Sequence, residues 1–193
     1  MSDPPAGLVY RPEVLSEDEE HALLREFEQL RFDEIRMHGV VARRTARHFG
    51  FDYDYERRAA VADAEPIPDW LVPVRETAAR LAEVEPQALA EALVQRYPEG
   101  AQIGWHRDAP MFGTVVGISL LSASRMRFRR GPAGARETWE LVLEPRSGYV
   151  LAGEARTTWQ HHVPPTKTLR YSITFRTLRR PERHRVADPT TTA

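Results

Sequence analysis

The sequence predicts an α+β protein whose core is a double-stranded β-helix, or jelly roll, covered by helices from the N-terminal part. Three observations predict this fold. Two segments before residue 85 space their apolar residues as amphipathic helices do, whereas many short strand-like segments follow from residue 92. Turn sequences rich in glycine and proline separate several of these strands. Such regularly spaced strands are typical of a sandwich or jelly roll, and 193 residues suit a single domain.

The first helix is expected to begin after Ser16, because Ser16 and Glu19 have the spacing of a capping box. Its apolar face would consist of Leu23, Phe27 and Leu30. A second helix is expected over residues 69–84, where the proline lies in the first turn and is tolerated. Its buried stripe would consist of Leu71, Val74, Ala78 and Leu81. Helices of this kind are expected to cover a face of the sheet.

The strands are expected in the second half of the chain, with turn sequences at residues 98–100, 131–134 and 145–148. They are predicted over residues 92–97, 102–105, 115–121, 125–129, 138–143, 149–151 and 169–176. Between the two helices, residues 32–58 form a polar and aromatic segment, and residues 59–68 read as a connector.

The composition excludes several classes of protein. The chain has no cysteine, so it has neither a disulfide framework nor a thiolate metal site. Its N-terminus lacks the basic and apolar regions of a secretory signal, and no apolar stretch approaches the roughly 18 residues of a membrane span. We therefore expect a cytoplasmic enzyme or binding protein with no membrane partner, and its size suggests a monomer.

The net charge of −1 conceals an uneven distribution of charge. Residues 1–42 contain 4 arginines against 10 acidic residues, whereas residues 98–193 contain 14 arginines and the single lysine, Lys167, against 8 acidic residues. A chain that is neutral on average can therefore present a basic face to an anionic partner.

A metal site is suggested by His106 and Asp108, which follow a short predicted strand. Residues two apart in an extended segment point to the same side, so both side chains could bind one ion. A third ligand would come from a distant strand, and on the residues alone His161 and His162 are both candidates. Two histidines and one carboxylate on one face are diagnostic of non-haem Fe(II) oxygenases, although a lone His-x-Asp is a weak signal.

The predicted strand over residues 169–176 alternates an apolar face with a polar face that carries Arg170 and Arg176. In isolation, this pattern favours a solvent-exposed polar face. The functional alternative places the polar face inside the barrel, where a buried guanidinium needs an anionic partner. The two arginines lie six residues apart, about 20 Å along a strand, so their side chains could flank a short dicarboxylate such as 2-oxoglutarate.

Together these motifs resemble the signature of the AlkB-like 2-oxoglutarate- and Fe(II)-dependent dioxygenases. The resemblance covers about residues 7–180, and residues 181–193 read as a flexible tail. The stretch at residues 159–165 resembles the family's His-x-Ile-Pro-Pro motif, which selects His161 rather than His162 as the third ligand. In chain order, the matching stretches are residues 43–55, 95–101, 104–108, 159–165 and 170–176.

The resemblance implies a role for each matching residue. The Fe(II) ligands would be His106, Asp108 and His161, with O2 and 2-oxoglutarate as cosubstrates. Arg176 would bind the far carboxylate of 2-oxoglutarate. Further cosubstrate contacts would come from Tyr97, Arg170, Ser172 and Gln95.

The activity that the resemblance implies is oxidative demethylation of an alkylated nucleobase in DNA or RNA, with release of succinate, CO2 and formaldehyde. A base must leave the stack to reach such a site. The chain departs from the family at two positions. Gln95 stands where the family usually has asparagine, and Pro110 stands where some members carry a second acid.

The nucleic acid is expected to contact a nucleotide-recognition lid at residues 32–58 and the metal loop. Candidate contacts are Arg43, Arg44, Arg47, Phe49, Tyr53, Tyr55 and Arg107. Aromatic rings can stack on an extruded base and arginines can bind phosphates. The alternative is a surface hairpin whose aromatic residues belong to the core. The three alternating arginines of residues 125–129 likewise read either as a solvated strand face or as a phosphate-contact stripe.

Two other functions stay open on the sequence. The same chemistry could act on a tRNA base, a protein side chain or a small molecule. A non-enzymatic jelly-roll binding module that keeps a relic site is the third alternative.

Overall fold

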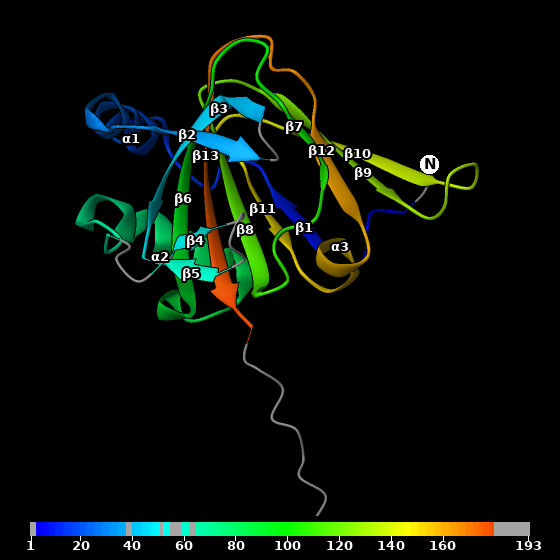
Figure 1. Cartoon of the computed structure of the whole chain (residues 1–193). Coiled ribbons are helices and arrows are strands. Elements are labelled where there is room, and N and C mark those ends of the chain that lie inside the picture. The colour runs from blue at the N-terminus through cyan, green and yellow to red at the C-terminus, as the bar shows by residue number, and fades with distance from the viewer. Residues whose placement is uncertain (1–2, 38–39, 51, 55–58, 62–64, 180–193) are drawn as a thin grey trace, which may run out of the picture.

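The computed structural model describes residues 3–37, 40–50, 52–54, 59–61 and 65–179. In these residues, antiparallel strands form a sheet of seven and a sheet of four, with few helices (Figure 1). A further two-stranded pair consists of β4 (Asp52–Asp54) and β5 (Ala59–Val61). Two antiparallel sheets with few helices are consistent with the expected jelly roll.

The larger sheet brings remote segments of the chain side by side. Its strands, in spatial order, are β1 (Leu8–Arg11), β11 (Gly148–Leu151), β8 (Phe112–Leu120), β13 (Arg170–Leu178), β6 (Leu89–Tyr97), β3 (Val40–Phe49) and β2 (Asp33–Met37). The smaller sheet has the order β10 (Glu137–Leu143), β9 (Ser124–Arg130), β12 (Gln160–Val163) and β7 (Ile103–His106). The seven predicted strands are confirmed to within a few residues, whereas β1 to β5 and β12 were not predicted as strands.

The two main helices begin where their sequences predict. Ser16 caps α1 (Glu17–Gln29): its Oγ accepts a hydrogen bond from the Glu19 backbone, and the Glu19 carboxylate accepts one from the Ser16 backbone. A 3-10 turn, η1 (Asp69–Leu71), leads into α2 (Val72–Ala82), and shorter elements are η2 (Pro86–Ala88) and α3 (Gly153–Thr157). None of the helices in the described residues is long and apolar enough to cross a membrane.

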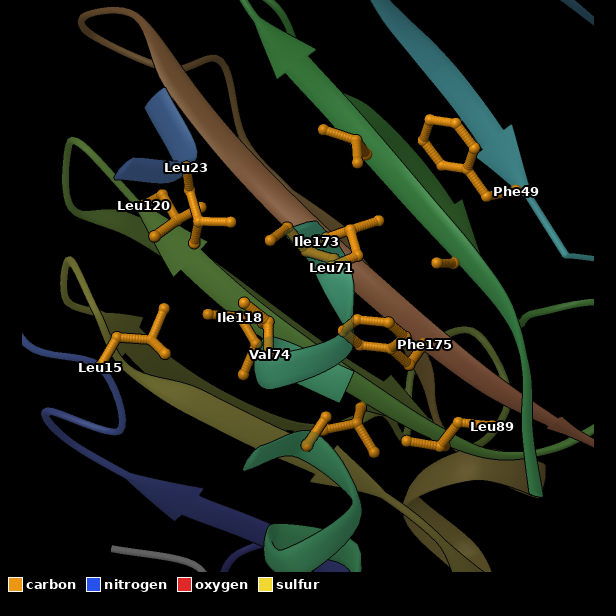
Figure 2. Close-up of a cluster of buried hydrophobic side chains, with 14 of the residues drawn as sticks. Leu15, Leu23, Phe49, Leu71, Val74, Leu89, Ile118, Leu120, Ile173 and Phe175 are labelled. Carbon is orange, nitrogen blue, oxygen red and sulfur yellow. The ribbon is translucent and has the colours of Figure 1, made fainter. Parts of the chain in front are cut away.

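Helices α1 and α2 cover one face of the larger sheet with apolar side chains (Figures 1 and 2). Strand β13 contributes Ile173 and Phe175, which are both fully buried, to this core. Other members from the helices and the neighbouring strands are Leu23, Phe27, Leu71, Val74, Ala78, Ile118 and Leu120. Because side chains alternate along a strand, this contact turns the polar residues of β13 toward the smaller sheet.

The polar face of β13 is therefore interior, and the expectation of a solvent-exposed face is wrong. Arg170 is 1% exposed and Arg176 is 6% exposed, and both line one cavity together with His161 and Val163 of the smaller sheet. Although the sequence of β13 alternates as in a strand with one solvent-exposed face, both faces of the strand are covered by other parts of the protein. The buried guanidinium groups are the first indication of a binding site between the sheets.

Three of the four arginines of β9 are paired with acids. Arg125 and Arg127 both bind Glu140 on the neighbouring strand β10, and Arg130 binds Glu137 and Glu154. These contacts favour the solvated strand face for Arg125 and Arg127, whereas Arg129 donates to Gln160 and lies over the Trp105 ring.

Candidate metal and cosubstrate site

Three side chains of the smaller sheet and its metal loop form a cluster that could hold a metal ion. His106 ends β7 and stands directly opposite His161 on β12, and Asp108 follows two residues later. One ligand atom from each of these residues lies within 4.8 Å of the others. Strand pairing therefore brings together ligands that are 55 positions apart in the sequence.

His162 lies outside this cluster. Its Nδ1 is 2.7 Å from the carbonyl oxygen of Ile103, and its ring packs against Trp105 at a centroid distance of 4.9 Å. Because side chains alternate along β12, His161 and His162 point to opposite faces. The structure thus places together the three residues that the resemblance selects.

The protonation states of the cluster suit a cation. Burial lowers the pKa of His161 to about 3 and also lowers the pKa of His106, so both imidazoles are neutral at pH 7. Burial alone would raise the pKa of Asp108, but the Arg176 guanidinium holds it well below its ordinary value. Two neutral imidazoles and an ionised carboxylate are the donor set of non-haem iron.

The Asp108 carboxylate has one oxygen available in the cluster. Its Oδ1 accepts a hydrogen bond of 2.9 Å from Arg176 Nε, whereas Oδ2 has no hydrogen-bond partner within the described residues and lies 3.6 Å from His161 Nε2. A buried oxygen without a partner is costly. A bound cation would satisfy it, so these residues fit an iron ion.

Arg156 of α3 anchors the loop that carries Asp108. Its Nη2 donates hydrogen bonds to the carbonyl oxygens of Ala109 at 2.7 Å and Phe112 at 2.8 Å. The side chain is 5% exposed. Arg156 therefore fixes the backbone on the C-terminal side of the metal loop.

The cluster opens into a cavity of about 1490 Å³ between the sheets. Its inner wall includes the three candidate ligands and the polar face of β13. Its outer part is lined by residues of β2 and β3 and of the metal loop. Ligand pockets usually measure about 300–1,000 Å³, so this one has room for more than a small cosubstrate.

Arg170 lies in this cavity without an acidic partner among the described residues. Its Nε donates to Ser119 Oγ at 3.2 Å, and its guanidinium lies 5.0 Å from the centre of the Tyr97 ring. The Nη1 group is buried and has no hydrogen-bond partner in the described part of the chain. A buried cation of this kind fits an anionic ligand.

Arg176 occupies a different position. Its Nε contacts Asp108 and its Nη1 donates to Glu91 Oε2 at 2.7 Å, so its guanidinium lies against the metal cluster. Asp108 and Glu91 accept hydrogen bonds from two of the five N–H donors of Arg176. The expectation that Arg176 binds the far carboxylate of 2-oxoglutarate stays a prediction.

The remaining cosubstrate candidates line the same wall. Tyr97 stands directly opposite Arg170 and Gln95 directly opposite Ser172 in the ladder of β6 and β13. The Tyr97 hydroxyl donates to Gln95 Oε1 at 3.2 Å. Residues directly opposite in antiparallel strands share a face, so these four side chains form one polar patch.

Tyr149 completes the patch from β11. It is 7% exposed, and burial raises the pKa of its hydroxyl. Its ring lies over Gly117 of β8, where a Cβ would overlap the ring atoms. The absence of a side chain at Gly117 therefore makes room for the tyrosine in the cavity wall.

Gly117→Ala is expected to destabilise the protein by about 1–3 kcal/mol, because the added methyl group must displace a buried ring. Gly104→Ala is the matched control, since a Cβ at Gly104 would meet nothing within 4 Å. Chemical denaturation of both variants measures the difference in the free energy of unfolding. Equal stability of the two variants would contradict the packing of Tyr149.

Two of the lid residues predicted for the substrate line the cavity: Arg43 and Arg44 of β3. Arg44 is 7% exposed, and its Nε has no hydrogen-bond partner in the part of the chain that the structure describes. Its charge also contributes to the lowered pKa of His106, after burial, so it lies near the metal cluster. Arg107 lines the cavity as well and donates to the carbonyl oxygens of Thr157 and Thr158.

The other lid candidates have different positions. Arg47 forms ion pairs with Asp33 and Glu65. Phe49 is 4% exposed and packs against Trp70 in the helix-covered core, so its prediction as a substrate-stacking residue is wrong. The side chains of Tyr53 and Tyr55 lie outside the described residues.

Sequence reasoning missed Glu91, Tyr149 and Arg156. Each is a polar residue in a segment that reads as ordinary strand or helix, and none belongs to a spaced motif. The register of β6 against β13 could have indicated Glu91, because it stands directly opposite Arg176. That register is not visible until the strands are paired.

The fold and the site define a class of protein: an oxygenase with a two-histidine, one-carboxylate iron centre beside a basic cosubstrate pocket. The chain belongs to the 2OG-Fe(II) oxygenase superfamily, whose family model matches residues 7–185, and within it the chain is AlkB-like. Members of this superfamily use Fe(II), 2-oxoglutarate and O2.

Named relatives agree with this placement. The chain is 29% identical over 178 residues to the tRNA (carboxymethyluridine(34)-5-O)-methyltransferase ALKBH8 of Mus musculus, covering 84% of this chain and 25% of the relative. It is 24% identical over 188 residues to the alkylated DNA repair protein ALKBH8 homolog of Arabidopsis thaliana, covering 83% of this chain and 51% of the relative. The chain therefore spans a quarter to a half of the length of these relatives.

A solved structure supports the fold. The structure of OsALKBH1 superposes with a TM-score of 0.67 over 92% of this chain and 99% of that chain, at 17% sequence identity. At this identity, the likeness concerns the fold alone.

Proposed function

We propose that the protein is a jelly-roll dioxygenase that demethylates alkylated nucleobases in DNA or RNA. The observation that carries the proposal is the cluster of His106, Asp108 and His161 in a large cavity. Beside it lies Arg170, which has no acidic partner among the described residues. The names of two relatives, one referring to tRNA and one to alkylated DNA, support a nucleic-acid substrate.

The residues of the cluster would hold iron through the two imidazoles and the Oδ2 atom of Asp108. When bound, iron with O2 and 2-oxoglutarate supplies the oxidising chemistry that converts an N-methyl group to formaldehyde, with succinate and CO2 as by-products. Burial keeps the two imidazoles neutral, and Arg156 holds the metal loop in place.

We assign the far carboxylate of 2-oxoglutarate to Arg170 rather than to Arg176. The Nη1 group of Arg170 has no hydrogen-bond partner among the described residues, and the Tyr97 hydroxyl and Ser172 lie on the same polar patch. Arg176 instead orients Asp108. Gln95 Oε1 accepts a hydrogen bond from the Tyr97 hydroxyl and so would fix the position of that hydroxyl beside the cosubstrate.

The outer part of the cavity would receive the substrate nucleotide. Arginines 36, 43, 44 and 107 line it, and only Arg36 of these has a carboxylate within ion-pair distance among the described residues. A basic wall suits a phosphate or another anionic group of the nucleotide.

The test of the function is turnover of methylated oligonucleotides with Fe(II), 2-oxoglutarate and ascorbate. We expect stoichiometric release of formaldehyde and succinate. Parallel reactions with single-stranded DNA, duplex DNA and tRNA compare the substrate classes, and the tRNA reaction is included because one relative is named for a tRNA nucleoside. Cosubstrate consumption without any nucleic-acid product would contradict the proposal and favour a protein or small-molecule substrate.

Arg44→Gln is expected to raise the KM for the oligonucleotide about ten- to hundredfold, because a hydrogen bond to a charged group contributes about 1.5–3 kcal/mol. The KM for 2-oxoglutarate should stay unchanged. Arg125→Gln is the matched control, since Arg125 is exposed and already paired with Glu140. Steady-state kinetics on both variants measures the effect. If only the KM for 2-oxoglutarate rises in Arg44→Gln, Arg44 binds the cosubstrate and not the oligonucleotide.

A further inference from the structure

Glu91 is a buried acid that belongs to neither the metal motif nor the cosubstrate patch. Its side chain is 0% exposed on β6, directly opposite Arg176 on β13. A carboxylate without contact to water must be paired, so its partners indicate why it is there.

The two oxygens of Glu91 have different partners. Oε2 accepts a hydrogen bond of 2.7 Å from Arg176 Nη1, and Oε1 lies 3.2 Å from Nδ1 of His48 on the next strand, β3. Nδ1 must carry the ring proton to donate to this oxygen. Burial raises the pKa of Glu91, but Arg176 and His48 outweigh it and the net pKa is lowered, so the carboxylate is ionised.

The same arginine contacts the metal cluster. Its Nε donates to Asp108 Oδ1 at 2.9 Å, while its Nη1 is held by Glu91. A guanidinium is planar and its donors point in fixed directions, so fixing one donor also fixes the direction of the others. The position of Arg176 therefore depends on Glu91.

We propose that Glu91 is a positioning residue for the metal centre. By holding Arg176 on Oδ1 of Asp108, it sets the orientation of that carboxylate and leaves Oδ2 for the cation, while His48 holds Glu91 from the other side. The role rests on the proposed function of Asp108 as a metal ligand.

Loss of the Glu91 charge would change how Arg176 contacts Asp108. Without the Glu91 charge, Arg176 can shift toward Asp108 and pair with both carboxylate oxygens, which is the preferred geometry between arginine and a carboxylate. That pairing would compete with the metal ion for Oδ2. Groups that orient metal ligands typically contribute about 10–100-fold to metal affinity.

Glu91→Gln is therefore expected to weaken Mn(II) binding about 10–100-fold. Glutamine has nearly the same size and can still accept a hydrogen bond, so the change removes mainly the charge. Isothermal titration of the metal-free protein with Mn(II) measures the affinity without any turnover. Glu20→Gln is the matched control: Glu20 is 6% exposed and accepts hydrogen bonds from the Leu121 backbone and Arg146 on the helix-covered side. It should lower stability and leave Mn(II) affinity unchanged.

A double-mutant cycle tests whether Glu91 acts through the arginine. Combined with Arg176→Gln, the Glu91→Gln change is expected to cause no further loss of Mn(II) affinity. The same loss in both backgrounds would overturn the proposal, because the charge of Glu91 would then act directly on the ion.

His48 gives a second test that leaves the buried ion pair intact. His48→Leu removes the hydrogen bond to Glu91 and should weaken Mn(II) binding severalfold, whereas His48→Asn can donate from a similar position and should restore it. These variants carry the test if Glu91→Gln does not fold, and equal affinity of His48→Leu and the wild type would then overturn the proposal.

The outcomes separate this role from the proposed function. If the wild type binds Mn(II) and Glu91→Gln binds it equally well, only the positioning role is overturned. If the wild type binds no Mn(II), the metal centre itself fails, and the role of Glu91 fails with it.

Discussion

His161→Ala is expected to abolish release of formaldehyde, whereas His162→Ala should retain it. The two histidines are adjacent in the sequence, but only His161 faces His106 across the strands, at a ring-centroid distance of 4.2 Å. Groups that only orient metal ligands change metal affinity or activity about 10–100-fold. Removal of a direct ligand should reduce activity by more than that. His162 contacts the Ile103 carbonyl instead, so its loss costs about 1 kcal/mol of stability.

The pair of variants serves as its own control, because each removes one imidazole from the same strand. Formaldehyde release and Mn(II) titration should both be lost in His161→Ala and both be preserved in His162→Ala. Thermal unfolding separates loss of the metal site from loss of the fold. Full activity of His161→Ala, or an equal loss in both variants, would contradict the proposed metal centre.

The elements that local patterns encode were predictable from the sequence. The capping box at Ser16 marks the start of α1 because both of its hydrogen bonds lie within one turn. The strands of the second half follow from alternation and from glycine and proline in the turns. Strand β12 was missed because its four residues are mostly polar, and the stretch was interpreted only as a motif.

The burial of the arginine strand could not be predicted from its own pattern. Alternation identifies two faces of β13 but does not say what covers each face. The smaller sheet covers the polar face, and Arg170 on that face is only 1% exposed. The resemblance to a family gave the correct interior position, whereas the local pattern favoured the wrong one.

The position of Phe49 also could not be predicted from its local pattern: it was expected in the substrate site, and it lies in the core. Its alternation with the aromatic residues that follow suggested a stacking face for a nucleobase, but strand β3 pairs with β6 so that Phe49 joins the helix-covered core. His48 and Arg44, on the other face of β3, line the cavity. The correct face depended on the register against β6, which a local pattern does not contain.

Arg170→Met is expected to weaken binding of 2-oxoglutarate by about 2–5 kcal/mol, or about thirtyfold to several thousandfold, since truncating one member of a buried charge pair has this effect. Metal affinity should stay unchanged, because Arg170 contacts Ser119 and Tyr97, whereas the Asp108 carboxylate is held by Arg176. Arg176→Gln should show the reverse pattern and lose Mn(II) affinity first. Titration of the Mn(II)-loaded variants with 2-oxoglutarate distinguishes the two arginines.

Although Arg170→Met should weaken binding of 2-oxoglutarate strongly, it should not destabilise the ligand-free protein. In the absence of a ligand, Arg170 is 1% exposed and its Nη1 lacks a hydrogen-bond partner within the described residues, so the native fold bears the cost of a buried unpaired charge. Methionine removes that charge at similar volume, which offsets the lost hydrogen bond to Ser119. We therefore expect the free energy of unfolding of ligand-free Arg170→Met to equal or exceed that of the wild type.

Addition of 2-oxoglutarate to the metal-loaded protein should then reverse the order of stability. At a concentration of one hundred times Kd, a ligand that binds only the native state stabilises it by about 2.7 kcal/mol. The wild type should gain this stabilisation, and Arg170→Met should gain less than about 1 kcal/mol at the same concentration. Denaturation of both proteins with and without 2-oxoglutarate measures the reversal. If both proteins gain equally, the far carboxylate is bound elsewhere, and Arg170 is an interior cation that the cosubstrate does not use.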